Sequence, residues 1–275
     1  MKKSILITGC SSGIGYTTAH YLNSHGFHVI ASCRKSEDVL RLQEEGLTCI
    51  QLDLTSEQSI EEGAKQAISL SDNGLYALFN NGAYGQAGAL EDLPTQGLRE
   101  QFETNFFGWH HLVLQILPHM RENGKGRIIQ NSSVLGFAAM KYRGAYNASK
   151  FAIEGWTDTL RLELHSSNIH VSIIQPGPIE TQFRANALLS FKRWITPSDS
   201  YHKAAYEQQL QRLSNTGSNN AFVLPPESCI KPVMHALTAS KPKLRYRITT
   251  PTKVFSVLKR ILPSRWLDPL LRKAA

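Results

Sequence analysis

The 275-residue sequence contains no long hydrophobic run. No apolar stretch approaches the roughly 20 residues that a helix needs to span a bilayer. The apolar residues that follow Met1-Lys2-Lys3 are too few for the core of a signal peptide, and no small-residue cleavage site comes after them. These absences predict a cytoplasmic protein.

Cysteine is scarce as well. Cys10, Cys33, Cys49 and Cys229 form neither a Cys-x-x-Cys pair nor a cluster of metal ligands. Isolated cysteines of this kind are typical of reduced thiols in the cytosol. We therefore expect no bound metal.

Acidic residues are almost missing from the C-terminal end. Residues 241–275 hold ten Lys and Arg against the single acid Asp268, a net charge of +9. Residues 1–240 hold 20 Lys and Arg against 21 Asp and Glu, a net charge of −1. The total of +8 therefore belongs to the tail, and the neutral body argues against a nucleic-acid partner.

The remaining pattern predicts one large α/β domain. Short β-branched or apolar runs alternate with longer amphipathic stretches, as in a parallel sheet with crossover helices. Helical patterns include 15–25, 56–70 and 146–166. The expected strands are 4–8, 28–33, 48–52, 76–80, 127–131, 170–175 and 245–249.

One irregular stretch, from Gln182 to Ala221, is polar and is predicted to be rich in loops. Long insertions in a compact domain are often lids or binding loops, and disorder is the alternative.

A glycine-rich turn, Thr8-Gly9-Cys10-Ser11-Ser12-Gly13-Ile14-Gly15, follows the first predicted strand. Gly9 allows the turn, Gly13 lets the backbone approach a pyrophosphate, and Gly15 lets the helix pack closely on the strand. Backbone N–H groups at the start of the helix would face the anion. Three glycines alone could form an ordinary turn, but the strand–turn–helix context indicates a nucleotide site.

Arg34 follows Cys33 at the end of the second predicted strand. Proteins that bind NAD tend to place an acid there, which hydrogen-bonds the adenosine ribose. A guanidinium suits a 2′-phosphate, which a carboxylate would repel. This predicts NADP(H) rather than NAD(H), and the alternative is an Arg34 that is merely solvated.

Tyr146 and Lys150 stand four residues apart and share one face of a predicted helix. A nearby cation lowers the pKa of a phenol, which normally lies near ~10. A phenol tuned in this way could exchange a proton near neutrality. By itself the pair could equally be a solvated surface pair.

Together these motifs resemble the short-chain dehydrogenase/reductase family over residues 4–250. Ser133 lies thirteen positions before Tyr146, as the catalytic serine of the family does, and Ser132 is one position out of register. Asn105 is similar to the active-site asparagine of the family. The resemblance therefore implies the catalytic set Asn105, Ser133, Tyr146 and Lys150.

The resemblance also implies a cofactor site. Asp53 is similar to the acid that contacts the adenine ring, and Asn80-Asn81-Gly82-Ala83 resembles the family's Asn-Asn-Ala-Gly with its last two residues exchanged. The implied cofactor-binding residues are Gly9, Ser11, Ser12, Gly13, Ile14, Gly15, Arg34, Asp53, Leu54, Asn81, Gly82, Tyr146, Lys150, Pro176, Gly177, Ile179 and Thr181.

The fold implied by the family is a single Rossmann-type doubly wound domain over residues 1–250, with the insertion at about 182–221. Its sheet has seven parallel strands in the order 3-2-1-4-5-6-7, with helices on both faces. Members often form homodimers through the helices after strands four and five.

The activity implied is NADPH-dependent reduction of a carbonyl compound to the alcohol. The chain is most similar to bacterial NADP-dependent aldehyde reductases, and more distantly to 17β-hydroxysteroid and retinol dehydrogenases. An apolar aldehyde is therefore the expected substrate, with a ketone, steroid or retinoid as variants. The alternative is a sensor or scaffold that binds NADP(H) without turnover.

Apolar and aromatic residues expected near the substrate would suit such a compound, although they could equally be core. They are Tyr84, Leu135, Phe137, Met140, Tyr142, Phe183 and Trp194.

Residues 251–275 are expected to form a basic amphipathic helical tail. Between Lys253 and Leu271, the apolar Val254, Phe255, Leu258, Ile261 and Leu262 fall largely on one helical side. Such helices can lie on anionic membranes, and the alternative is a helix packed on the body with its charges solvated.

Overall fold

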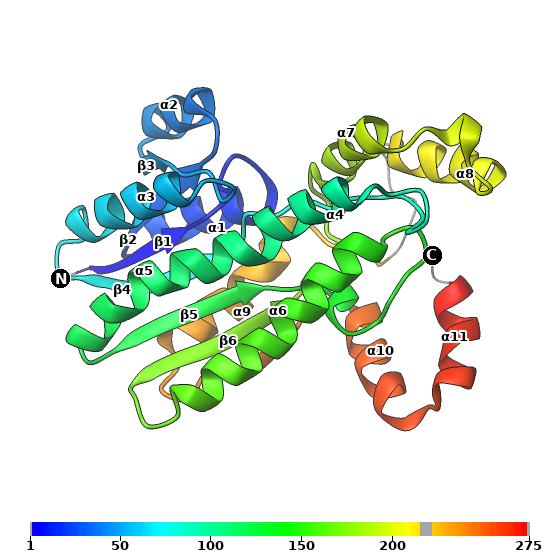
Figure 1. The fold of residues 1–275 in the computed structure, drawn as a ribbon. Helices are drawn as coiled ribbons and strands as arrows, with labels where there is room; N and C mark the ends of the chain where they lie inside the picture. Colours follow the sequence, from blue (N-terminus) through cyan, green and yellow to red (C-terminus); the bar gives the residue numbers. More distant parts are fainter. Residues whose placement is uncertain (1, 215–221, 274–275) are drawn as a thin grey trace.

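The computed structural model describes residues 2–214 and 222–273 (Figure 1). Its centre is a seven-stranded parallel sheet in the order β3-β2-β1-β4-β5-β6-β7, which confirms the predicted fold. The strands are β1 (Lys3–Ile7), β2 (Phe27–Cys33), β3 (Thr48–Gln51), β4 (Leu75–Asn80), β5 (Gly126–Asn131), β6 (Ile169–Gln175) and β7 (Arg245–Arg247).

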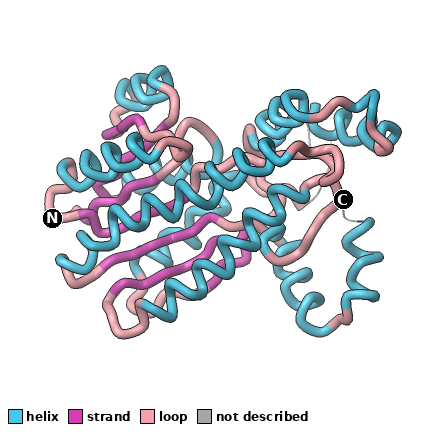
Figure 2. The backbone as a smooth tube through the Cα atoms, viewed as in Figure 1, coloured by secondary structure: helices cyan, strands magenta, loops and turns pink. Residues whose placement is uncertain are grey.

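Helices cover both faces of the sheet, as the tube in Figure 2 shows. One face packs against α3 (Glu57–Ser69), α5 (Gly108–Glu122) and α6 (Gly144–Glu163). The other face packs against α1 (Gly13–Ser24), α2 (Ser36–Glu44) and α9 (Ile230–Thr238). Helix α9 follows a short 3-10 turn, η4 (Pro226–Cys229).

The strands alternate between two buried layers because side chains of a strand point to opposite faces in turn. In β1, Ile5 and Ile7 enter one core and Leu6 enters the other. A strand that is apolar on both faces is typical of a central parallel sheet. This arrangement leaves polar chemistry to the loops at the carboxyl ends of the strands.

Strand β7 ends earlier than the sequence pattern indicated, at Arg247 rather than residue 249. Thr249 is instead the residue before the next helix, with extended backbone. Between β4 and α5 lie α4 (Thr95–Phe102) and a π-helical segment, η1 (Glu103–Phe107).

The expectation that residues 182–221 are rich in loops is wrong for most of that stretch. It holds α7 (Phe183–Trp194), a 3-10 turn η3 (Pro197–Asp199) and α8 (Lys203–Ser214), while 215–221 lie outside the described residues. Phe191 and Tyr206 of these helices pack against Ala87 and Ala89 in a separate small core. Because α7 and α8 bury only the few side chains of this small core, much of their sequence is polar.

The tail differs from the single helix that its pattern suggested. It forms α10 (Thr250–Ile261) and α11 (Ser264–Lys273), separated at Leu262 and Pro263. Proline lacks the N–H that would continue the helix, so the chain turns there. Figure 1 shows the two helices extending from the body at the side opposite α7 and α8.

No helix in residues 2–214 and 222–273 is both long enough and apolar enough to cross a bilayer.

Candidate active site

The glycine-rich turn closes tightly on the loop after β4. Gly9 has a φ of +69°, and a Cβ there would lie 2.5 Å from the Cα of Gly82. Gly13 has a φ of +60°, and a Cβ there would lie 2.8 Å from Cγ2 of Thr181. Both positions require glycine, because an L side chain would be strained and would collide.

Hydrogen bonds lock the two loops together. Thr8 Oγ1 accepts from the backbone N–H groups of Asn81 and Gly82, each at 2.9 Å. The Asn81 amide donates to the Thr8 carbonyl at 2.9 Å and accepts from Asn131 Nδ2 at 2.8 Å. Asn81 therefore holds the glycine turn and the end of β5 at fixed positions rather than presenting its amide to a ligand.

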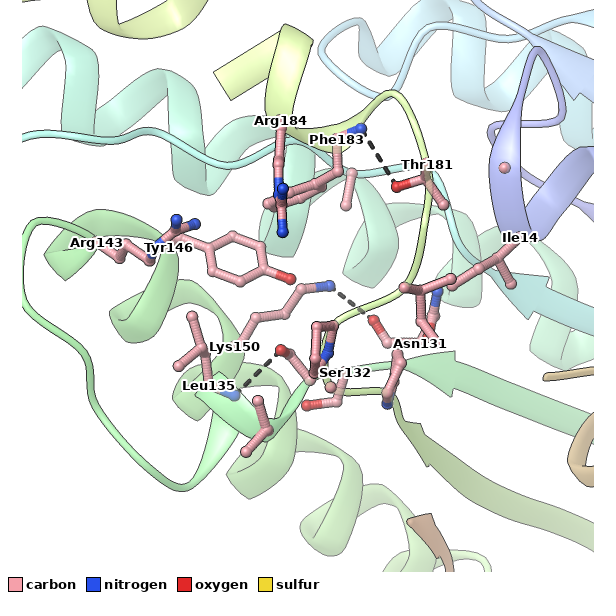
Figure 3. Close-up of a pocket in the computed structure, with 18 of the residues that line it drawn as sticks. Ile14, Asn131, Ser132, Leu135, Arg143, Tyr146, Lys150, Thr181, Phe183 and Arg184 are labelled. Carbon is pink, nitrogen blue, oxygen red and sulfur yellow. Dashed lines mark hydrogen bonds between the residues drawn. The ribbon is translucent and has the colours of Figure 1, made fainter. Parts of the chain in front are cut away.

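Tyr146 and Lys150 lie on the buried face of α6 and enter one cavity from it (Figure 3). The Tyr146 ring meets Phe183 of α7 edge-on, with 5.2 Å between centroids. Its side chain is only 8% exposed. The pair is therefore part of a closed site and not a solvated surface pair.

Lys150 is fully buried, and its ammonium donates to the carbonyl of Asn131 at 2.7 Å. The same nitrogen lies 4.3 Å from the centre of the Trp109 ring, within cation–π range. Burial lowers the pKa of Lys150 to about 7, and the Glu154 carboxylate one helical turn away opposes this shift.

The pKa of Tyr146 differs from the sequence expectation. Burial raises it to about 12, while a hydrogen bond with Ser133 and the charge of Arg143 pull it down. The expected lowering by Lys150 is wrong for this structure. The Lys150 nitrogen is directed to Asn131 and lies 5.7 Å from the Tyr146 ring centre.

Ser133 lies where the family pattern places the catalytic serine. It precedes the 3-10 turn η2 (Val134–Gly136), and its hydroxyl accepts from the Leu135 N–H at 3.1 Å. Ser133 lines the same cavity as Tyr146, and its hydroxyl pulls the pKa of Tyr146 down. Ser132 also lines the cavity, and its buried hydroxyl has no hydrogen-bond partner among the described residues.

Asn105 lies in the π-helical segment η1 and does not line the cavity. Its side chain forms two hydrogen bonds to the backbone of Tyr84, at 3.2 and 2.9 Å, and a third to the Ser149 hydroxyl at 3.3 Å. These contacts tie the loop after β4 to α6. Asn105 thus lies within a local distortion of the helix and buries its side chain against these neighbours.

Most of the predicted cofactor residues share the cavity, whose volume is about 660 Å³. Gly15, Arg34, Asp53 and Leu54 lie outside its lining. The lining members of the predicted set are Gly9, Ser11, Ser12, Gly13, Ile14, Asn81, Gly82, Tyr146, Lys150, Pro176, Gly177, Ile179 and Thr181.

The outlying residues differ in role. Arg34 is exposed just beyond β2, at the carboxyl edge of the sheet that also carries the glycine turn. The Asp53 carboxylate accepts from the backbone and hydroxyl of Thr55, at 2.9 and 2.8 Å, and so shapes its own turn. Leu54 is buried beneath Gly82.

The substrate side of the cavity contains only part of the expected apolar set. Leu135, Met140 and Phe183 line it, whereas Tyr84, Phe137, Tyr142 and Trp194 do not. Tyr142 and Trp194 pack instead against the core of α7 and α8. Further apolar residues of the wall, which no sequence motif indicated, are Phe222 and three residues of the tail: Pro251, Phe255 and Leu271.

Other residues that shape the site were also missed. Trp109 donates to the Gly82 carbonyl at 2.8 Å, and its ring covers the Lys150 ammonium. Trp109 lies four residues after Asn105, and this helical spacing could have indicated that it belongs to the site. Arg41 of α2 donates to the Ser11 carbonyl at 2.8 Å and pairs with Asp38 and Glu45. No local motif marks Arg41, because the contact spans 30 residues.

The site fits a dinucleotide on structural grounds. Glycines keep the turn free of side chains at the start of α1, and a single Cβ there would collide with neighbouring residues. The free backbone N–H groups at a helix start can hydrogen-bond a phosphate. Two buried polar atoms that have no partner within residues 2–214 and 222–273, Asn131 Oδ1 and Ser132 Oγ, belong to residues that line the same cavity. Such atoms are normally satisfied, so a polar ligand is expected there.

Comparison with known proteins assigns the class. The sequence profile described as short chain dehydrogenase matches residues 3–189. The chain belongs to the short-chain dehydrogenase/reductase family, and it is an oxidoreductase with a nucleotide-binding Rossmann-type fold.

Two relatives show the range of similarity. The chain is 44% identical to the uncharacterized oxidoreductase YbbO of Escherichia coli K12 over 272 residues, which cover 99% of this chain and 95% of the relative. It is 30% identical to human retinol dehydrogenase 8 over 270 residues, which cover 94% and 85%.

Two solved structures share the fold. A short-chain dehydrogenase/reductase from Burkholderia phymatum in complex with NAD has a TM-score of 0.78 at 22% identity, covering 98% of this chain and 95% of that one. A variant of the actinorhodin polyketide ketoreductase with NADPH has a TM-score of 0.72 at 24% identity, covering 90% and 95%.

Proposed function

We propose that this protein reduces the carbonyl group of an apolar compound, such as an aldehyde, to the alcohol with NADPH. The observation that carries the proposal is that Ser133, Tyr146 and the buried Lys150 line the same cavity as the glycine-rich turn. A protein that only bound the cofactor would gain nothing from two adjacent hydroxyl groups and a buried cation.

The hydroxyl groups of Ser133 and Tyr146 would hold the substrate oxygen between them. Bound NADPH would supply the hydride. As negative charge grows on the substrate oxygen, Ser133 stabilises it by hydrogen bonding and Tyr146 donates its proton. A Tyr146 pKa of about 12 keeps the phenol protonated before that step, so the group is ready to act as the acid.

Lys150 and Asn105 would complete the proton path. The Lys150 ammonium would hydrogen-bond the nicotinamide ribose, and a pKa of about 7 lets it pass a proton near neutrality. Asn105 fixes the loop after β4 against α6 and would hold a water between Lys150 and solvent.

The apolar wall supports an apolar substrate. Leu135, Met140 and Phe183 line the cavity together with the tail residues Phe255 and Leu271. The name of the relative retinol dehydrogenase 8 points to a lipid-like alcohol and so supports the same class. Ketones, steroids and retinoids of similar polarity are the other members of that class.

A substrate panel tests the proposal. Full-length protein with NADPH and a series of aldehydes, ketones and steroids should oxidise the cofactor, measured by the loss of its absorbance. Turnover should rise with chain length of the aldehyde. Tight NADPH binding without turnover of any compound would instead support a sensor or scaffold.

Arg34 is expected to select the cofactor. Replacing Arg34 by Ala should raise the KM for NADPH about tenfold to a hundredfold, since a charge-assisted hydrogen bond contributes about 1.5–3 kcal/mol. The KM for NADH should stay unchanged, because NADH lacks the 2′-phosphate. Initial rates with both cofactors measure the effect.

Lys35 provides a matched control, because it is the next residue and its ammonium lies 3.1 Å from Glu37. Lys35→Ala should leave both KM values nearly unchanged. An equal effect of the two substitutions would show that only general positive charge matters, and no effect of Arg34→Ala would remove the assignment.

We also propose a homodimer formed through α5 and α6, the helices that follow β4 and β5. Leu114 of α5 and Leu162 of α6 are exposed apolar side chains, 51% and 67% accessible. Light scattering should give a dimer mass for the natural protein and a monomer mass for Leu114→Glu. A monomer mass for both would contradict the proposal.

The four cysteines are free and buried, which agrees with a reducing compartment. We propose a cytoplasmic location on this basis. Fractionation of cells that carry the tagged protein tests it, and recovery from an oxidising compartment would contradict it.

A further inference from the structure

The tail helices expose large apolar side chains that the body does not cover. On α10 these are Val254, Val257 and Ile261, which are 47%, 56% and 66% accessible. On α11 Trp266 and Leu270 are 69% and 42% accessible. The spacings of three and four residues put each group on one side of its helix. The expected alternative, a tail whose apolar side is packed on the body, does not account for these five residues.

Basic side chains surround this apolar surface. Lys253 and Arg260 are exposed on α10, and Arg265 and Arg272 are exposed on α11. Asp268 is the single acid of residues 241–275, whose net charge is +9. Two such surfaces would repel each other, so a second copy of this chain is disfavoured. An anionic lipid surface attracts them instead, because each Lys or Arg near the surface gains from the negative surface potential.

The exposed tryptophan adds a second lipid-directed feature. Indole rings are enriched at the level of lipid headgroups, where their apolar and polar parts are both satisfied. Trp266 is among the most exposed large hydrophobic side chains of the described residues, at 69%. Basic amphipathic helices that carry Trp and aliphatic residues lie in the plane of a membrane.

Other residues of the same two helices face the cavity. Pro251 and Phe255 of α10 and Leu271 of α11 line it. Phe255, which lines the cavity, directly follows the exposed Val254 in α10. The thickness of one helix therefore separates the cavity from the outer apolar surface. In Figure 1 both helices extend from the body below the start of α6.

We propose that α10 and α11 form a docking surface for an anionic bilayer, made of Val254, Val257, Ile261, Trp266 and Leu270 with their basic neighbours. Docking holds the cavity mouth against the lipid, so an apolar carbonyl compound reaches Tyr146 from the bilayer without crossing water. The docking to the bilayer is independent of the proposed function. The delivery of substrate from the bilayer rests on the proposed function.

Vesicle flotation with the full-length protein tests the docking. The natural protein should float with vesicles that contain phosphatidylglycerol and remain behind with pure phosphatidylcholine. The triple variant V257S/I261S/W266S should lose about tenfold in bound fraction, because it removes apolar area that the interface would bury. Leu40→Ser with Leu70→Ser is the matched control, since both residues are exposed apolar side chains far from the tail in sequence, and it should bind as the natural protein does.

Three results would overturn the docking surface: no flotation with anionic vesicles at physiological salt, equal flotation with neutral vesicles, or unchanged flotation of the triple variant. A change of oligomeric mass in the triple variant, without vesicle binding by the natural protein, would assign the surface to a second copy instead. Unchanged circular dichroism and thermal melting show that each variant is folded.

An activity comparison tests the delivery step. With a long-chain aldehyde dissolved in anionic vesicles, the triple variant should lose about tenfold in kcat/KM. With a short water-soluble aldehyde it should match the natural protein, because none of its three substitutions lines the cavity. Flotation without turnover of either aldehyde would leave docking standing and contradict the proposed function, whereas equal losses on both aldehydes would contradict delivery.

Discussion

Replacing Tyr146 by Phe should lower kcat/KM for NADPH-dependent carbonyl reduction by about a thousandfold, within the 10²–10⁴ that a positioned acid contributes. The substitution removes only the hydroxyl. The ring keeps its edge-on contact with Phe183 and its place in the core, so the fold and the apolar wall remain. Initial rates with the best aldehyde of the panel measure the loss.

Two controls separate chemistry from folding. Tyr201→Phe removes a hydroxyl from a side chain that is 93% exposed, and it should leave the rate unchanged. The affinity of Tyr146→Phe for NADPH, measured by fluorescence titration, should fall by no more than a few fold. A Tyr146→Phe rate within about threefold of the natural rate would exclude Tyr146 as the proton donor.

Replacing Lys150 by Met should stabilise the protein and inactivate it. Burial lowers the pKa of Lys150 from 10.5 to about 7, so keeping its charge in the fold costs about 5 kcal/mol. The methionine lacks this penalty but leaves the Asn131 carbonyl without its donor, which costs about 1–3 kcal/mol. The net gain in the free energy of unfolding at pH 6 is therefore expected to be about 2–4 kcal/mol.

The gain depends on pH in a defined direction. Between about 7 and 10.5 the unfolded chain binds the lysine proton and the folded chain does not, so the stability of the natural protein rises with pH in this window. Below about 7 both states are protonated and the full penalty applies. The advantage of Lys150→Met should therefore be largest below pH 7 and shrink as the pH approaches 10.

Urea unfolding at several pH values measures this, with Lys65→Met as the control because Lys65 is exposed on α3. A Lys150→Met protein that is less stable than the natural one at pH 6 would show that the buried charge is compensated. Loss of carbonyl reduction together with higher stability would identify Lys150 as a residue retained for function.

Much of the site could be predicted because its motifs are local. The glycine turn, Ser133 and the Tyr146–Lys150 pair each require particular residue types at short spacings, so they can be recognised within one segment. The sheet could be predicted for a similar reason, since short apolar runs separated by amphipathic helices admit few parallel arrangements. The helices of residues 183–214 could not, because the small core that orders them is completed by Ala87 and Ala89, about 100 positions earlier.

The sequence by itself determined the class of protein and the order of the strands, and it pointed to the residues proposed for proton transfer. The tertiary structure alone decided their electrostatics: the pKa values of Tyr146 and Lys150 are set by desolvation, which sums over every neighbour that excludes water. It also decided that the tail lines the cavity on one side and stays exposed on the other. An amphipathic pattern identifies the apolar side of a helix but not what covers that side. Contacts between segments distant in the sequence decide what covers it.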